Sequence, residues 1–250
     1  MYTPCLAVSF YGGAAESAAS FAALDALVSC GFRLSRVSAS GMSAAGAILF
    51  LSGAGGSLPG ELSLLPSYII SVCTSRSLSS LSVPLTAVLT DAQTGTAAIF
   101  GERALGELRT DSALFIPDAP LDGIIRACSC PWTAARPLDT PFGALCGVPS
   151  AAGIRYIFSG AMREGEDAAL RIIFASTHPG SVCAGDMAAR VALLLGEDMR
   201  LLAGDAPGYE IVLHPDPDAP AHELFADIRS AVAAEAERIA LYCLNGKNVV

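Results

Sequence analysis

The chain has 250 residues, 52% of them hydrophobic and 16% charged, a composition that excludes intrinsic disorder. Its formal net charge of −9, from 15 Lys and Arg against 24 Asp and Glu, excludes the basic surface typical of a nucleic-acid-binding protein. No stretch reaches the roughly 18 consecutive apolar residues of a membrane-spanning helix, so no transmembrane segment is expected.

Short apolar runs alternate with helical spacings of apolar residues along the chain. Phe21, Leu24 and Leu27 recur at the helical interval, for example, and Gly31 is placed to end that helix. Strands that alternate with helices indicate βαβ units and a mainly parallel sheet. The expected strands are residues 6–10, 34–39, 85–90, 154–158, 170–175 and 210–213, and the expected helices are residues 16–30, 44–51 and 222–244.

The alternation breaks in two places. Residues 53–66 are rich in Gly, Ser and Leu, and residues 131–153 are rich in Pro, Gly and Ala. Both segments are predicted to be surface loops that roof a site at the carboxyl ends of the strands. Because no repeat, charge run or linker divides the chain, we expect one α/β domain over residues 1–250.

The first five residues contain no Lys or Arg and lead directly into the first expected strand. A secretory signal instead has a basic segment before its apolar segment. We therefore expect a cytoplasmic protein, and trimming of a longer chain is the alternative explanation of this start.

Eight cysteines are scattered along the chain, mostly in apolar surroundings and without a CxxC pair. We interpret them as buried reduced thiols, with a disulfide framework as the alternative. Cys128 and Cys130 are too close in sequence for the usual zinc-ligand spacing. One loose polar group comprises His214, Asp216, Asp218 and His222. We interpret that group as a solvated loop, with a weak metal site as the alternative, so neither a metal nor a cofactor is predicted.

Ser43 lies where the second expected strand meets the following helix. A serine on a sharp strand-to-helix turn projects its hydroxyl above the sheet, and the helix dipole points at it. Gly41, Met42 and Ser43 therefore have the form of a nucleophile elbow, and a helix N-cap serine is the alternative. Gly12 and Gly13 follow the first strand in the same way, where backbone N–H groups form an anion cradle.

Further motifs follow in order along residues 6 to about 165. They are AALDAL at residues 22–27, TDAQTG at 90–95, IRACSCP at 125–131 and RYIFSGA at 155–161. Together with the two turns, these motifs resemble the patatin-like phospholipase family of lipid acyl hydrolases. The rest of the chain matches that family only loosely. The resemblance implies a single-domain three-layer α/β/α fold with a mainly parallel central sheet.

The same resemblance implies a Ser–Asp dyad. It assigns Ser43 as the nucleophile, and the backbone of Gly12, Gly13 and Ala14 as the oxyanion hole. The position of the family's aspartate is occupied by Ser159. A neutral hydroxyl with no base behind it does not activate another hydroxyl, so the dyad is incomplete.

Three more positions depart from the family pattern. Ala14 replaces the third glycine of the glycine loop, Glu16 replaces a basic residue, and Ala45 replaces the second glycine of the elbow. A carboxylate at Glu16 opposes the negative charge that develops at an oxyanion site. We therefore expect a catalytically impaired member of the family that binds a lipid, an acyl chain or a protein partner.

The alternative is an active serine acyl hydrolase, of the esterase or phospholipase A type, in which Ser43 works with a non-standard base. His178 is the best-placed substitute base, although the ordinary interpretation of a histidine after a strand is a loop residue. Asp91 and Asp122 have structural interpretations, in a turn and in the first turn of a helix. A third interpretation is an unrelated α/β protein, in which the glycine-loop strand does not lie beside the strand before Ser43.

Overall fold

The computed structural model describes residues 3–11, 16–53, 64–73, 75–101, 113–129, 138–140, 143–147, 153, 156–157, 162–174, 208–216 and 219–246. The strands are β1 (Cys5–Tyr11), β2 (Arg33–Ser40), β3 (Leu85–Asp91), β4 (Ala97–Gly101), β5 (Ala113–Ile116), β6 (Leu138–Thr140), β7 (Gly143–Cys146), β8 (Ala168–Phe174) and β9 (Tyr209–Leu213). The helices are α1 (Glu16–Ser29), α2 (Gly41–Leu51), α3 (Leu65–Cys73), the short 3₁₀ helix η2 (Leu78–Ser80), α4 (Leu121–Cys128), α7 (Ala221–Ala234) and α8 (Ala236–Gly246).

The described strands form a single mainly parallel sheet in the order β5-β4-β3-β2-β1-β8-β9. β1 is parallel to both β2 and β8, and β3 and β9 extend the parallel arrangement on either side. β4 is antiparallel to β3, and the β6–β7 hairpin joins the far end of β3 through Thr90 and Asp91. The α/β class and the mainly parallel central sheet are therefore as predicted from the sequence.

The two faces of the sheet carry different side chains, because successive residues of a strand point to opposite sides. Leu6, Val8 and Phe10 of β1 belong to one buried apolar cluster that includes residues of α1, α2, α4 and α7. Ser9, which lies between them, donates from its Oγ to the Ile157 carbonyl at 3.2 Å. Residues 156–157 therefore lie against the second face, an arrangement compatible with three α/β/α layers.

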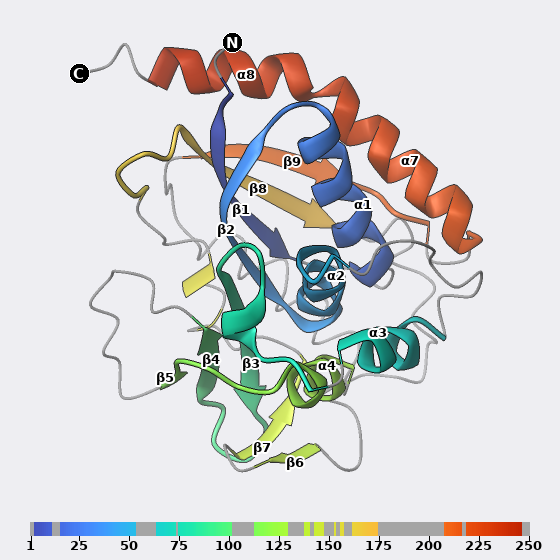
Figure 1. Ribbon diagram of the computed structural model, residues 1–250, viewed down its shortest axis with the longest axis vertical. Helices are drawn as coiled ribbons and strands as arrows, with labels where there is room; N and C mark the ends of the chain where they lie inside the picture. Colours follow the sequence, from blue (N-terminus) through green and yellow to red (C-terminus); the bar gives the residue numbers. More distant parts are fainter. Residues whose placement is uncertain are drawn as a thin grey trace.

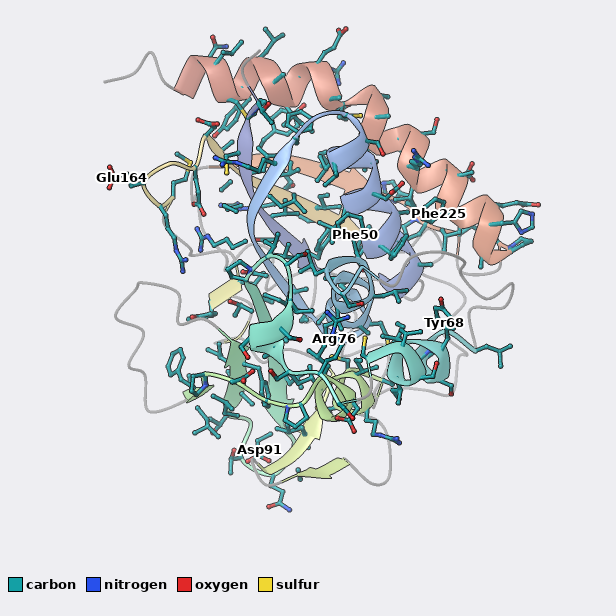
Figure 2. All side chains as sticks on the ribbon, viewed as in Figure 1. Phe50, Tyr68, Arg76, Asp91, Glu164 and Phe225 are labelled. Atoms are coloured by element: carbon teal, nitrogen blue, oxygen red, sulfur yellow. The ribbon has the colours of Figure 1, made fainter. Side chains whose placement is uncertain are left out.

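α1 lies between α2 and α7, and small side chains allow the close approach. Five alanines of α1 are fully buried or nearly so: Ala18, Ala19, Ala22, Ala23 and Ala26. The ring of Phe21 lies 5.6 Å from that of Phe50 on α2 and 5.7 Å from that of Phe225 on α7. Figure 2 labels the last two side chains, on the two helices that flank α1. Aromatic pairs of this kind add about 0.5–1.5 kcal/mol each beyond the area they bury.

Figure 1 shows how the remaining helices divide along the sheet. α7 and α8 run along its β8–β9 side, whereas α3 and α4 lie near β3. The elements expected at residues 6–10, 16–30, 34–39, 85–90, 170–175 and 210–213 are all present, with ends that shift by one or two residues. Within the described residues, no helix has both the length and the apolar character needed to cross a bilayer.

Several expectations about individual elements are wrong. Within the expected strand at residues 154–158, Tyr156 and Ile157 are helical and buried. A short apolar run looks the same in a buried helix as in a buried strand, so its length decides nothing. The segment at residues 131–153, expected to be a loop, contains the β6–β7 hairpin, and α3 begins inside the expected loop at residues 53–66.

The expected helix at residues 222–244 is two helices. α7 ends at Ala234, and α8 begins at Ala236. The carboxylate of the intervening Glu235 accepts a hydrogen bond from the Tyr209 hydroxyl at 2.7 Å and from Arg238 at 2.9 Å. These contacts tie the junction to β9, and no Pro or Gly marks it in the sequence.

The described cysteines largely follow the expected burial. Cys5, Cys73, Cys128, Cys146 and Cys243 are buried, and Cys30 is exposed at the turn after α1. Burial raises the pKa of the Cys73 thiol, which lies 3.8 Å from the Ser52 hydroxyl. A buried thiol of this kind is unreactive packing material, in line with the interpretation from the sequence.

Candidate functional site

The strands that precede the two predicted turns lie side by side. β1 and β2 are parallel and paired from Cys5 with Arg33 to Ser9 with Ser38, so both run out at the same edge of the sheet. α2 then begins directly at the end of β2. Gly12, Gly13 and Ala14 follow β1 but lie outside the described residues. The first strand of the chain therefore lies beside the strand that precedes Ser43.

The turn between β2 and α2 is made by Gly41. Ser40 before it is extended, with φ −127° and ψ 160°, and Gly41 itself has φ +52°. A positive φ is costly for a residue with a Cβ, which explains a glycine here. In the described part of the chain, Ser75 is the sole non-glycine residue with a positive φ. Ser43 is therefore the third residue of a regular helix, two positions after the sharp turn.

Ser43 is fully buried, with no exposed surface. Its carbonyl oxygen accepts a hydrogen bond from the Ser20 hydroxyl of α1 at 3.0 Å, which joins the two helices. Ala44, Ala45 and Gly46 after it are also buried, and their small size permits this packing. A nucleophile elbow presents its serine hydroxyl to the substrate, whereas the Ser43 hydroxyl is shielded from solvent.

A comparison of the chain with models of known protein families finds no match. A sequence comparison with curated proteins likewise finds none.

The other residues predicted for the site fall partly outside the described ranges. Ser159, in the position of the family's aspartate, and His178, the substitute base, lie outside them. Of the residues that depart from the family pattern, Ala45 is buried in α2, and Glu16 is the first residue of α1. The predicted pocket between the two turns therefore stays a prediction.

Asp91 and Asp122 have the local structures expected of them. Asp91 ends β3 and closes its own turn, since its carboxylate accepts from the Gln93 N–H at 3.1 Å and the Thr94 hydroxyl at 2.7 Å. Figure 2 shows it on the side of the molecule away from α8. Asp122 lies in the first turn of α4, where the helix dipole stabilises a negative charge. Both positions agree with the structural interpretation of these two residues.

No metal centre is found among the described residues, because no three His, Cys, Asp or Glu side chains converge there. His214, Asp216 and His222 of the loose polar group are exposed, and Asp218 lies outside the described ranges. His214 and Asp216 fit the solvated-loop interpretation, whereas His222 is the second residue of helix α7 and does not belong to a loop.

An ion pair that sequence reasoning missed joins the middle of β2 to the segment before β8. Arg36 Nε lies 2.9 Å from Glu166 Oε1, and its Nη2 lies 3.2 Å from Oε2. The Arg36 side chain is 11% exposed and the Glu166 side chain is 3% exposed, so the pair has little contact with solvent. Burial alone would raise the pKa of Glu166, but its hydrogen bonds and the Arg36 charge lower it. An arginine inside an expected buried strand was the available signal, because such a charge needs a partner.

Sequence reasoning also missed a cleft. It lies between η2, the start of β3 and the end of β5, and has a volume of about 690 Å³. Ser79 lines it, and the Ser79 hydroxyl donates to the Asp118 carboxylate at 3.0 Å. The cleft combines residues 78–85 with Gly101 and with Phe115 and Pro117, so no local motif in the sequence indicates it.

Proposed function

We propose that this chain is a patatin-like domain that has lost ester hydrolysis and binds a lipid or acyl chain, with a protein partner as a second class of ligand. The observation that carries the proposal is the full burial of Ser43 in a regular turn of α2. The replacements at Ser159 and Glu16 support it from the sequence. The family assignment itself rests on the ordered motifs and on the pairing of β1 with β2.

The chemistry of acyl transfer explains why these features matter together. The hydroxyl must come within about 3 Å of the ester carbonyl, next to a base that takes its proton. Backbone N–H groups must then stabilise the oxyanion. A buried Ser43 hydroxyl cannot easily come close to an ester carbonyl. The Ser159 hydroxyl is not a base that could take its proton, and the Glu16 carboxylate opposes the negative charge of an oxyanion.

An active acyl hydrolase is the second candidate function. It is favoured by the common edge at which β1 and β2 end, and by the start of α2 immediately after β2. In that geometry the positive end of the α2 dipole lies where β2 ends, and it favours negative charge there. Ser43 would then need its surroundings to open before a substrate could reach it.

Fluorophosphonate labelling tests the proposal directly. Purified wild-type protein, Ser43→Ala and Ser20→Ala are treated with the probe, and adducts are located by mass spectrometry. Ser20 is a matched control, because it is an equally buried serine on the neighbouring helix. We expect no adduct at Ser43 and no hydrolysis of p-nitrophenyl butyrate above the rate in buffer.

The contrary result is equally specific. An adduct at Ser43, with hydrolysis that Ser43→Ala abolishes and Ser20→Ala retains, would overturn the loss of catalysis and establish the hydrolase. Circular dichroism on each variant confirms that the labelled protein is folded, and an active serine esterase in parallel confirms that the probe is competent.

A further inference from the structure

The cleft lies near the amino end of β3, whereas Ser43 lies beyond the carboxyl end of β2. Leu85, the first residue of β3, pairs with Val37 of β2. Ser43 comes six residues after Val37, beyond the end of β2. The described residues that line the cleft are Leu78, Ser79, Leu81, Pro84, Leu85, Gly101, Phe115 and Pro117. Six of these eight side chains are apolar, and none carries a charge. The volume, about 690 Å³, is in the range of small-molecule sites.

Backbone contacts hold the walls of the cleft in place. The Leu78 N–H donates to the Ala119 carbonyl at 3.1 Å, and the Leu121 N–H donates to the Arg76 carbonyl at 2.9 Å. These bonds join the η2 segment to the segment that follows β5. The Phe115 ring packs edge-on against Tyr156, with centroids 5.7 Å apart. The cleft is therefore formed before any ligand binds.

Ser79, the one polar side chain among the described residues that line the cleft, is hydrogen-bonded to the carboxylate of Asp118, which lies beside that lining. Asp118 accepts from the Ser79 N–H at 3.1 Å, from the Ala119 N–H at 3.0 Å and from the Ser79 hydroxyl at 3.0 Å. The backbone hydrogen bond from Ser79 contributes most to lowering the pKa of Asp118, so the group is ionised at neutral pH. Because the Ser79 hydroxyl donates to Asp118, its oxygen serves as an acceptor in the cleft, and the negative charge lies one hydrogen bond behind it.

We propose that this cleft binds an amphiphile with an apolar body and a protonated amine head. The apolar body lies against Leu78, Leu81 and Phe115, and the ammonium group donates hydrogen bonds to Asp118 and Ser79. A carboxylate head meets the Asp118 charge at close range and is disfavoured. The inference does not depend on whether Ser43 is reactive, because Ser43 is not among the residues that line the cleft.

Calorimetric titration with decan-1-amine, decan-1-ol and decanoate, each below its micelle concentration, tests this site. We expect the amine to bind about threefold more tightly than the alcohol at low salt, and decanoate to bind most weakly. A factor of this size is what a solvent-exposed ion pair supplies, and it should shrink as salt is added. If none of the three compounds binds, or if decanoate binds best and Leu81→Gln weakens that binding, the proposal is overturned.

Two pairs of variants locate the binding. Asp118→Asn should make amine and alcohol affinities equal, whereas Asp122→Asn, which removes the same charge from the neighbouring helix, should leave the preference intact. Leu81→Gln should weaken both ligands about tenfold, because it removes part of the apolar wall. Ser43→Ala should bind as wild type does, which separates this result from the test of the proposed function.

Crosslinking of the wild-type protein provides a measurement that needs no variant. A diazirine-bearing alkylamine should attach within residues 78–85 or 113–117, as located by mass spectrometry, and excess decan-1-amine should block it. Attachment at other positions, or an amine preference that Asp118→Asn leaves unchanged, would refute the assignment.

Discussion

Arg36 and Glu166 show how one buried pair connects two parts of the chain that are distant in sequence. Glu166 precedes β8 and reaches Arg36 on β2, while also accepting from the Ser35 hydroxyl and the Arg163 N–H, both at 2.7 Å. The bidentate geometry gives each charge a fixed partner in a place that excludes water. Removing one partner leaves the other charge buried and uncompensated, which costs more than the pair itself contributes.

Glu166→Gln should therefore lower the free energy of unfolding at about pH 7 by roughly 3 kcal/mol. The pKa of Glu166 is lowered in the folded state, so its contribution is complete above the unfolded pKa. That contribution is lost as the pH falls through the folded pKa. The difference between wild type and variant should accordingly narrow in acid, as measured by urea denaturation from about pH 7 to about pH 3.

Glu237→Gln is the matched control, because Glu237 is an exposed carboxylate in the first turn of α8. Its effect should stay within about 0.5 kcal/mol across the same pH range. Equal stability of wild type and Glu166→Gln at about pH 7 would show that the pair does not stabilise the fold.

At the scale of elements, the end of β4 depends on a glycine. Gly101 has φ +103°, and a Cβ placed there would lie 2.0 Å from the Leu85 carbonyl oxygen on β3. Gly31, after α1, has φ +89° and open space around the same position. The first residue therefore combines backbone strain with a steric clash, and the second has backbone strain alone.

Gly101→Ala should destabilise the protein by more than about 2 kcal/mol, whereas Gly31→Ala should cost about 1 kcal/mol. Urea denaturation followed by circular dichroism measures both. Similar losses in the two variants would mean that β3 and β4 can separate to admit a methyl group. In that case the wall of the cleft next to Gly101 would be softer than its geometry indicates.

At the scale of the whole molecule, the charge balance limits the partners. With a net charge of −9 and Lys247 as its one lysine, the chain repels polyanions over the distance of a Debye length. We expect no change in the fluorescence anisotropy of a labelled DNA duplex at about 50 mM salt and micromolar protein. A basic protein of similar size is the positive control, and saturable, salt-sensitive binding would contradict the expectation.

Sequence reasoning anticipated the elements whose pattern is local. β1, β3 and β8 are largely apolar runs, and β2 and β9 carry polar residues between apolar ones. In α1, Phe21, Leu24 and Leu27 recur at the helical interval. The strand expected at residues 154–158 was wrong, because adjacent apolar residues such as Tyr156 and Ile157 suit either a helix or a strand. The β6 and β7 strands were missed because three and four residues are too few for a periodic signal.

For the candidate site, the chain alone identified the strand, the turn and the helix around Ser43, since these follow one another directly. It placed the sharp turn at Ser43, whereas the structure has it at Gly41. The burial of Ser43, the Arg36–Glu166 pair and the cleft beside Ser79 could not be anticipated. Each depends on side chains from segments 23 to 130 residues apart, as Ser20 with Ser43 and Arg36 with Glu166 illustrate.

One physical cause separates the features that could be predicted from the sequence from those that only the structure showed. Dihedral preferences and apolar periodicity act between residues a few positions apart, so strands, helices and the α/β class can be inferred from order along the chain. Solvent exclusion and the pairing of a buried charge depend on which distant surfaces meet, and that follows from packing the sheet against its helices. Local patterns were therefore enough to predict a strand before Gly41 and a helix soon after it, and the folded arrangement was needed to show that Ser43 lies within that helix and is buried.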